Sequence, residues 1–235
     1  KFLSFVFAIA ILSASARSEF VAFTPGAPVQ KIGGKSREIP SAPVKAETPA
    51  AVKSEANPYE SLVTRLAQKV NGLGAAQFES GRAIIEELHL QLTAANQPVN
   101  KNLAAYLLAT AYADTSLLPN EEKLASDSRL SKIQATYFKQ GLQGRGFVHF
   151  SGAYNYNRFA RDNKLSIAKN PKLLLDKKVA AKVFVSGALN GHFTGTKIGR
   201  YIPSTGAADF AGARRAVNGD VNAVSIAKLA ADIAN

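Results

Sequence analysis

The chain has 235 residues, no cysteine, no tryptophan and a formal net charge of +12. The lack of cysteine excludes a fold held together by disulfides, and the roughly 180 residues beyond the N-terminal segments suffice for one domain with its own core. The basic excess favours anionic partners. Nucleic acid is not expected among them, because the sequence has no nucleic-acid motif and no interleaved array of arginines and aromatic residues.

The first residues have the pattern of a secretory signal peptide, which we place at residues 1–16. Lys1 provides the basic start, residues 2–12 are apolar, and the Ala-Ser-Ala of residues 14–16 is a small-residue cleavage pattern. The apolar run is too short to span a membrane. We therefore expect secretion to the extracellular space. Phe20 and Phe23 are compatible with a second targeting signal of the kind found in algal bipartite presequences. In that case the alternative destination is a plastid or vacuole.

Residues 17–57 are interpreted as a disordered linker. Prolines punctuate this stretch among Ala, Ser, Lys and Glu, and it has few large apolar side chains to offset the entropy of ordering. The folded domain is therefore predicted to span residues 58–235.

The domain is predicted to be mainly helical. Asn57, Pro58 and Glu60 mark a helix start, and further helices are expected at residues 75–94, 101–113 and 177–190. Asp176 should cap the last of these, and Gly191 should end it. His89 is interpreted as structural, and no metal or other cofactor is expected. A C-terminal amphipathic helix is expected to bury a set of apolar side chains: Val221, Val224, Ile226, Leu229 and Ile233.

Residues 144–156, GRGFVHFSGAYNY, combine features of a turn and of a binding site. The glycines suit a close backbone approach, and Val148 and Phe150 predict a short strand with one buried face. The Asn and Tyr side chains of this stretch offer amide and hydroxyl groups beside aromatic faces, which suits a sugar. The alternative interpretation is a tight turn followed by a core strand.

Several segments, in order, resemble motifs of family 19 glycoside hydrolases, the plant-type chitinases and the related lysozyme-like enzymes of bacteria and phages. Residues 144–152, GRGFVHFSG, resemble the family's GRG(Y/F)(V/I)QL(T/S), and Asn155-Tyr156 resembles the NY that follows. Residues 170–176 resemble NP-x-LLLD, residues 191–195 resemble GWFTG, and residues 213–219 resemble ARRIVNG. The resemblance covers residues from about 103 to the C-terminus. It implies a lysozyme-like, two-lobed helical fold with a small β element around residues 147–150 beside a cleft.

The resemblance also implies a pair of catalytic carboxylates. Residues 105–112, AYLLATAY, resemble a family segment that is followed by His-Glu-Thr, where Glu is the general acid; here Asp114 takes that position. Asp is one methylene shorter, so catalysis is expected to be weakened. Glu122 resembles the second carboxylate, with Glu121 as the other candidate. The alternatives are a solvated Asp at the end of a helix and an acidic helix start near Asn120.

The resemblance implies a substrate-binding set in the same region. His149 replaces a family Gln and His192 replaces a frequent Trp, which leaves stacking to Tyr and Phe. One arginine of the pair at 214 and 215 is expected to hold a carboxylate or a substrate oxygen, and the other to form a surface ion pair. The expected substrate-binding residues are Arg145, His149, Ser151, Asn155, Tyr156, Arg214 and Asn218.

The leading hypothesis is a monomeric, secreted, inverting hydrolase that cuts β-1,4 links in peptidoglycan or chitin and associates with an anionic cell-wall surface. The rival is a non-catalytic carbohydrate-binding protein on the same scaffold. A raised pKa of Asp114 in a cleft would favour the enzyme, whereas Asp114 held in a salt bridge would favour the binding protein. A third hypothesis, a cationic disruptor of walls or membranes, would not need either carboxylate.

Overall fold

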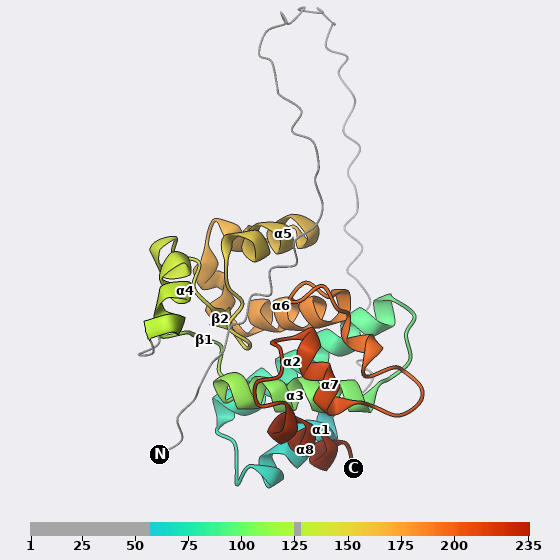
Figure 1. Cartoon of the computed structure of the whole chain (residues 1–235). Coiled ribbons are helices and arrows are strands. Elements are labelled where there is room, and N and C mark those ends of the chain that lie inside the picture. Colours follow the sequence, from blue (N-terminus) through green and yellow to red (C-terminus); the bar gives the residue numbers. More distant parts are fainter. Residues whose placement is uncertain (1–56, 125–127) are drawn as a thin grey trace, which may run out of the picture. The chain divides into compact units, whose positions relative to one another are not determined.

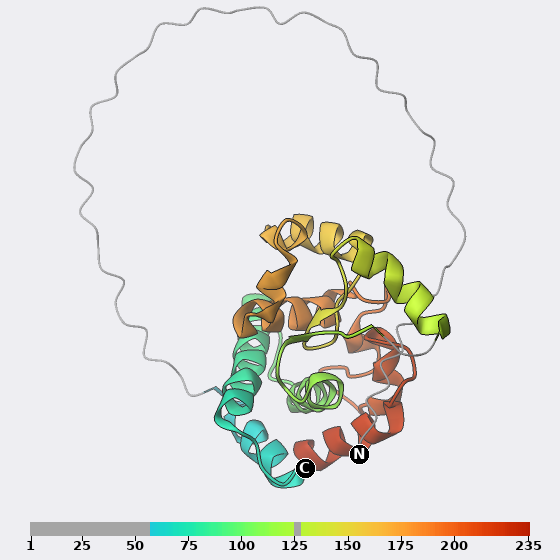
Figure 2. The same ribbon diagram turned by 90° about the vertical axis from the view of Figure 1, so that its left-hand side faces the viewer.

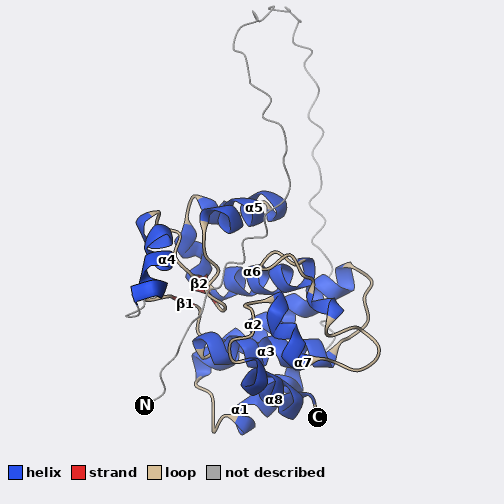
Figure 3. Ribbon diagram, viewed as in Figure 1, coloured by secondary structure: helices blue, strands red, loops and turns tan. Residues whose placement is uncertain are grey.

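The computed structural model describes residues 57–124 and 128–235, and this part of the chain is mainly helical, which confirms the expected class (Figures 1 and 3). The predicted signal peptide and nearly all of the predicted linker lie outside the described residues. None of the helices in the described ranges is long and apolar enough to cross a membrane. The α-helices there are α1 (Glu60–Lys69), α2 (Ala75–Ala94), α3 (Lys101–Thr115), α4 (Ser128–Lys139), α5 (Ala153–Asn163), α6 (Lys177–Asn190), α7 (Phe210–Ala213) and α8 (Ala223–Ala234). Short 3₁₀ helices are η1 (Ser166–Ala168), η2 (Pro171–Leu175), η3 (Ile198–Arg200) and η4 (Arg214–Ala216).

Helix α3 is the central element of the larger helical group. Its Ala- and Leu-rich sequence is buried on nearly every side, from Leu103 to Ala111, as expected for a helix with no polar face. Helices α1, α2 and α8 pack against it, and Figure 2 shows it nearly end-on among them. Its C-terminal end therefore lies at the border of a packed core, where Asp114 and Thr115 are placed.

The helix boundaries agree closely with local sequence signals. Helix α2 has the predicted bounds, and Asp176 caps α6 by accepting hydrogen bonds from the backbone N–H groups of Lys178 and Val179, at 2.9 and 3.0 Å. Helix α6 ends at Gly191, whose φ of 71° suits glycine. Helix α1 starts at Glu60, later than predicted. Helix α3 runs to Thr115, past the predicted end.

One prediction for the last helix is wrong. Val224 was expected on the buried side of the C-terminal helix, but its side chain is 81% exposed. Ile226 and Ile233 are buried as expected, together with Ala230. Val224 is the second residue of α8, so its side chain lies beyond the edge of the helix that faces α3.

The small β element lies next to the predicted position rather than on it. Strand β1 (Asn120–Glu121) pairs antiparallel with β2 (Arg145–Gly146), with Asn120 opposite Gly146. Residues 147–149 form a turn, and Phe150 returns to Arg145 through two backbone hydrogen bonds of 2.9 and 3.1 Å. The expected strand over residues 147–150 is therefore wrong. The positive φ angles of Gly146 (83°) and His149 (51°) reverse the chain there.

Two hydrophobic clusters can be traced in the described residues. The larger joins α1, α2, α3, α6 and α8, and it also includes Phe147 and Val148. The smaller consists of Phe150, Tyr156, Phe159, Ile167, Leu174 and Val183. The turn at residues 147–149 therefore passes from one cluster to the other, which places the β element at their junction.

Candidate functional site

The candidate acid, Asp114, lies in the last turn of α3 and is bound by an arginine. Arg214 Nη1 and Nη2 each donate to one Asp114 carboxylate oxygen, at 2.8 Å, and the two side chains are 1% and 9% exposed. Arg214 Nε donates to the Val221 carbonyl at 2.9 Å. An acid at the C-terminal end of a helix opposes the helix dipole, and the guanidinium offsets this charge. In this arrangement both carboxylate oxygens accept hydrogen bonds from a cation, so neither oxygen is free to face a substrate.

The neighbouring Thr115 connects the same helix end to the turn at residues 147–149. Its hydroxyl lies 3.0 Å from the Ala111 carbonyl and 3.2 Å from the Phe147 carbonyl, and it is buried. The threonine of the Ala-Asp-Thr triplet thus positions α3 against the motif turn.

Glu122 follows β1 and is also held from both sides. Its Oε1 accepts from the Gly144 backbone N–H at 2.5 Å, and its Oε2 accepts from Gln134 Nε2 of α4 at 3.0 Å. The Glu122 backbone N–H donates in turn to the Gly144 carbonyl at 2.9 Å. The side chain is only 7% exposed. This carboxylate is therefore part of the connection between β1, β2 and α4.

The first glycine of the GRG motif leaves room for this connection. A Cβ atom on Gly144 would lie 2.7 Å from the His149 Cβ, 2.8 Å from the His149 carbonyl oxygen and 2.9 Å from the Glu122 Cδ. Real Cβ atoms do not tolerate contacts this short. The close approach expected of the motif glycine is thus to His149 and Glu122.

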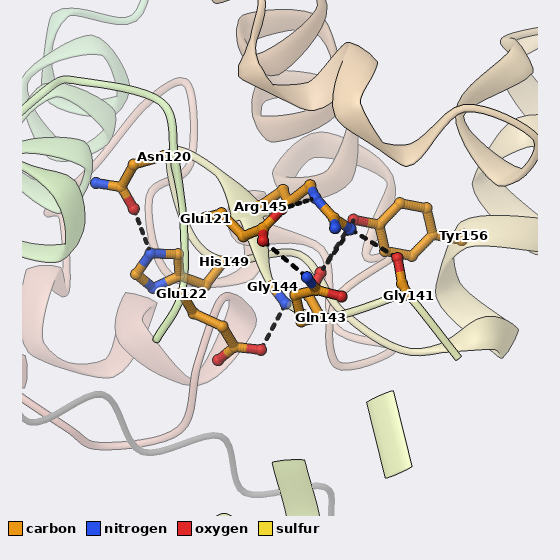
Figure 4. Close-up of polar contacts among 9 residues, drawn as sticks. All are labelled: Asn120, Glu121, Glu122, Gly141, Gln143, Gly144, Arg145, His149 and Tyr156. Atoms are coloured by element: carbon orange, nitrogen blue, oxygen red, sulfur yellow. Dashed lines mark hydrogen bonds and ion pairs between the residues drawn. The ribbon is translucent and has the colours of Figure 1, made fainter. Parts of the chain in front are cut away.

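His149 is influenced by the charges of both candidate carboxylates. Its Nε2 lies 2.7 Å from Asn120 Oδ1 (Figure 4), so with that oxygen as acceptor Nε2 carries the hydrogen. Its Nδ1 is buried and has no hydrogen-bond partner among the described residues. Burial lowers the pKa of His149, while the negative charges of Glu122 and Asp114 act in the opposite direction. We call these three side chains the Asp114–Glu122–His149 cluster, because both charges act on one imidazole ring.

Glu121 belongs to a different network. Gln143 Nε2 donates to its Oε1 at 2.8 Å, and Arg145 Nε donates to its Oε2 at 2.5 Å. Burial alone would raise the pKa of Glu121, but the hydrogen bonds from Gln143 and Arg145 and the arginine charge lower it overall. Glu121 lies opposite Arg145 in the β1–β2 pairing, so this ion pair holds the two strands together.

Arg145 and Tyr156 are internal residues, and the expectation that Tyr156 lines a cleft is wrong. Arg145 is 4% exposed, and its Nη1 donates to the Gly141 carbonyl at 2.9 Å. Tyr156 is 0% exposed, its hydroxyl donates to the Gln143 carbonyl at 3.2 Å, and burial raises its pKa to about 12. In Figure 4 the Arg145 side chain lies between Glu121 and Tyr156, away from the His149 ring. The two residues brace the loop before β2 against α5.

The hydrogen bonds of the other predicted binding residues connect them to their own segments and not to the Asp114–Glu122–His149 cluster. Asn155 Nδ2 donates to the Ser151 carbonyl at 2.9 Å, within the first turn of α5. The Asn218 backbone N–H donates to the Arg214 carbonyl at 2.8 Å and closes the turn after η4. Arg215 forms an exposed ion pair with Asp220 at 2.8 Å, whereas Arg214 holds the buried Asp114 carboxylate, so the two arginines divide as expected into a surface ion pair and an internal contact.

Sequence reasoning missed three amide side chains of this region: Asn120, Gln134 and Gln143. Each contacts a predicted site residue: Asn120 contacts His149, Gln134 contacts Glu122, and Gln143 contacts Glu121. Gln134 lies in a helix without a recognised motif, so its role had no sequence signal. Gln143 immediately precedes the motif and could have been included on position alone.

A cavity of about 720 Å³ lies at the other end of α3. Asn100 and Leu103 line it, with residues from the ends of α2 and α6 and from η3. Fourteen residues of helix, roughly 20 Å, separate Asn100 from Asp114. The Asp114–Glu122–His149 cluster is therefore packed polar structure, separate from this cavity.

No protein-family model, curated protein or solved structure matches the chain. The family resemblance of the motifs therefore stays a prediction.

Proposed function

We propose that this chain binds a polysaccharide containing N-acetylglucosamine, either peptidoglycan or chitin, without efficient hydrolysis. The observation that carries the proposal is the bidentate ion pair between Asp114 and the buried Arg214, at 2.8 Å for both bonds. An inverting hydrolase needs one carboxyl group that gives a proton to the leaving oxygen. A carboxylate already engaged by two guanidinium hydrogen bonds does not meet this need.

The state of Glu122 supports the same proposal. The second carboxylate of an inverting pair must activate a water molecule, with the two groups roughly 6.5–9.5 Å apart to admit it. Both oxygens of Glu122 already accept protein hydrogen bonds, and its side chain is 7% exposed. Both candidate carboxylates therefore act as structural acceptors in this conformation.

Binding is supported by two accessible side chains in or near the motif region. Tyr154 is 73% exposed at the start of α5 and offers an aromatic face for a sugar ring in a chain without Trp. Asn120, whose Oδ1 lies 2.7 Å from His149 Nε2, is also exposed. The proposal includes a lysozyme-like, two-lobed scaffold. The two hydrophobic clusters, with the β element at their junction, are compatible with it.

Hydrolysis is the second candidate, and the presence of carboxylates at 114 and 122, the positions that resemble the family's catalytic pair, favours it. In that case substrate binding must draw Asp114 away from Arg214. This alternative predicts that Asp114→Glu, which restores one methylene, raises turnover about tenfold, equivalent to roughly 1.4 kcal/mol of barrier.

A retention experiment tests the binding proposal. The full chain is incubated with insoluble chitin and with purified peptidoglycan, and the bound fraction is compared for wild type, Tyr154→Ala and the control Tyr112→Ala on α3. We expect wild type to be retained and Tyr154→Ala to lose up to about tenfold in affinity, about 1.4 kcal/mol, at the upper end of the roughly 0.5–1.5 kcal/mol of an aromatic contact. Equal affinities for wild type and Tyr154→Ala, or no retention of wild type on either polymer, would refute the proposal.

A further inference from the structure

The basic charge of the chain is concentrated in one stretch, residues 158–182, which we call the basic segment. It holds eight basic and two acidic side chains, a net charge of +6, which is half of the +12 of the whole chain. The basic side chains are Arg158, Arg161, Lys164, Lys169, Lys172, Lys177, Lys178 and Lys182. A stretch of about a tenth of the chain thus carries half of its net charge.

The elements that carry these side chains pack against one another in succession. Helix α5 contacts η1, η1 contacts η2, and η2 contacts α6, so the segment is spatially continuous (Figure 1). Lys164, Lys169 and Lys172 are exposed, and so are Arg161 and Lys178. The buried side of the segment is apolar and belongs to the smaller hydrophobic cluster.

The acidic side chains nearby neutralise only part of this charge. Asp162 pairs with Arg161 at 2.9 Å and with Arg158 at 3.8 Å, while Lys177 pairs with Glu79 of α2. Asp176 is occupied as the cap of α6. Among the described residues, no ion pair is formed by the remaining lysines: Lys164, Lys169, Lys172, Lys178 and Lys182.

We propose that the basic segment is a binding surface for an anionic polysaccharide, a glycan with repeated carboxylate groups. Six of its eight cations are lysines. A lysine is a flexible point charge, which suits a polymer whose charges are spaced along the chain, whereas arginine suits planar, bidentate recognition of a single group. A neutral glycan would gain nothing from this surface, so the partner must carry negative charge.

The composition of the segment disfavours two other polyanions. Its one aromatic residue, Phe159, is 0% exposed, which leaves Tyr154, outside the segment on the same helix, as a single exposed ring and not an array that stacks on the bases of a single strand. Leu175, at 38%, is its exposed large apolar side chain, so it lacks the apolar face with which an interfacial helix enters a membrane. A carboxylated glycan requires neither feature.

This surface is separate from the Asp114–Glu122–His149 cluster and does not depend on the proposed chitin or peptidoglycan binding. Lys172 nevertheless lowers the pKa of Glu121 through its charge, so the segment adjoins the β element. A long polymer could therefore contact both regions.

Two triple variants with the same net charge test the proposal. Lys164→Gln, Lys169→Gln and Lys172→Gln are combined in one chain, and Lys69→Gln, Lys101→Gln and Lys228→Gln in the other; all six lysines are exposed. Affinity for immobilised polygalacturonate is measured from about 50 to 300 mM salt, with circular dichroism to confirm folding. We expect the first variant to lose about tenfold or more at low salt and to show a shallower salt dependence, since it forms fewer ion contacts. The second variant should stay within about twofold of wild type.

Equal losses in the two variants would overturn the proposal, because total charge rather than the basic segment would then determine binding. Binding of wild type to duplex DNA or to phosphatidylserine vesicles as tightly as to polygalacturonate would overturn the choice of a glycan. Retention on neutral chitin, measured in parallel, should be the same for both variants, which separates this test from that of the proposed function.

Discussion

Arg214 and Asp114, one hundred positions apart in the chain, form a buried bidentate ion pair with two N···O distances of 2.8 Å. The pair connects the end of α3 to the segment between α7 and α8. Because Arg214 also donates to the Val221 carbonyl, its side chain links η4 to the end of α3 and to the segment before α8. The residue that resembles a catalytic acid is thus also a structural contact of the core.

Replacing Arg214 should therefore destabilise the protein far more than replacing its neighbour. In Arg214→Leu the Asp114 carboxylate is left buried and unpaired, which typically costs about 3–5 kcal/mol. Arg215→Leu removes an exposed ion pair with Asp220 and should leave the free energy of unfolding unchanged within error. Urea unfolding of both variants measures the difference. A similar loss of unfolding free energy in the two variants would show that the buried ion pair stabilises the protein no more than the exposed one.

The Gly144 contacts predict a steric effect at the motif turn. Gly144→Ala places a Cβ within 3 Å of His149 and Glu122, and it should destabilise the protein by about 1–3 kcal/mol. Gly199→Ala is the matched control, since nothing lies within 4 Å of a Cβ there and its φ is not positive. Thermal unfolding compares the two. A Gly144→Ala protein as stable as Gly199→Ala would contradict the packing described for the turn.

Two buried tyrosines should respond in opposite ways to loss of the hydroxyl group. Tyr156 donates to the Gln143 carbonyl at 3.2 Å and lies 3.4 Å from Arg145 Nη1, so Tyr156→Phe should cost about 1 kcal/mol or more. The Tyr106 hydroxyl is buried and forms no hydrogen bond of good geometry among the described residues; burial raises its pKa to about 12, and the nearby Thr110 hydroxyl opposes this rise only weakly. Tyr106→Phe should therefore be neutral or stabilising. Denaturant unfolding checks both, and a larger loss for Tyr106→Phe would contradict these hydrogen-bond assignments.

Two histidines predict how stability depends on pH. Burial lowers the pKa values of His149 and His192 below the ordinary 6.5, so the unfolded chain binds these protons more tightly than the folded protein. The stabilisation is therefore complete above pH 6.5 and is lost as pH falls through the lowered values. Urea unfolding at pH 7.5 and 5.5 should show this loss, with a smaller change in a variant combining His149→Gln and His192→Phe. An equal pH dependence in the variant would assign the effect to other groups.

Local signals were enough to predict most helices. The bounds of α2 and the cap and stop of α6 depend on neighbouring residues, as with Asp176 and Gly191, and they could be read from the sequence. The turn at His149 could not, because a positive φ, here 51°, is uncommon for a residue other than glycine. Val224 was misplaced because a hydrophobic repeat does not show where the edge of a buried face lies.

The candidate site was only partly predictable. The motifs placed Asp114 and Glu122 in one region, and the charges of both act on His149. Motifs give residue identity but not side-chain direction, so Arg145 and Tyr156 were expected to bind substrate although both are internal. The Asp114–Arg214 pair joins distant segments, and the sequence left its partner open between a carboxylate and a substrate oxygen.

The most direct measurement of the central claim is product analysis with a hexamer of N-acetylglucosamine. Wild type, Asp114→Asn and Glu122→Gln are incubated with the hexamer, shorter oligomers are quantified by chromatography, and binding is measured by calorimetry. If the two carboxylates are structural, wild type should bind the hexamer and release no more short oligomers than the two variants. Cleavage by wild type that falls to background in Asp114→Asn, with the variant still folded and still binding, would contradict the account and establish the hydrolase.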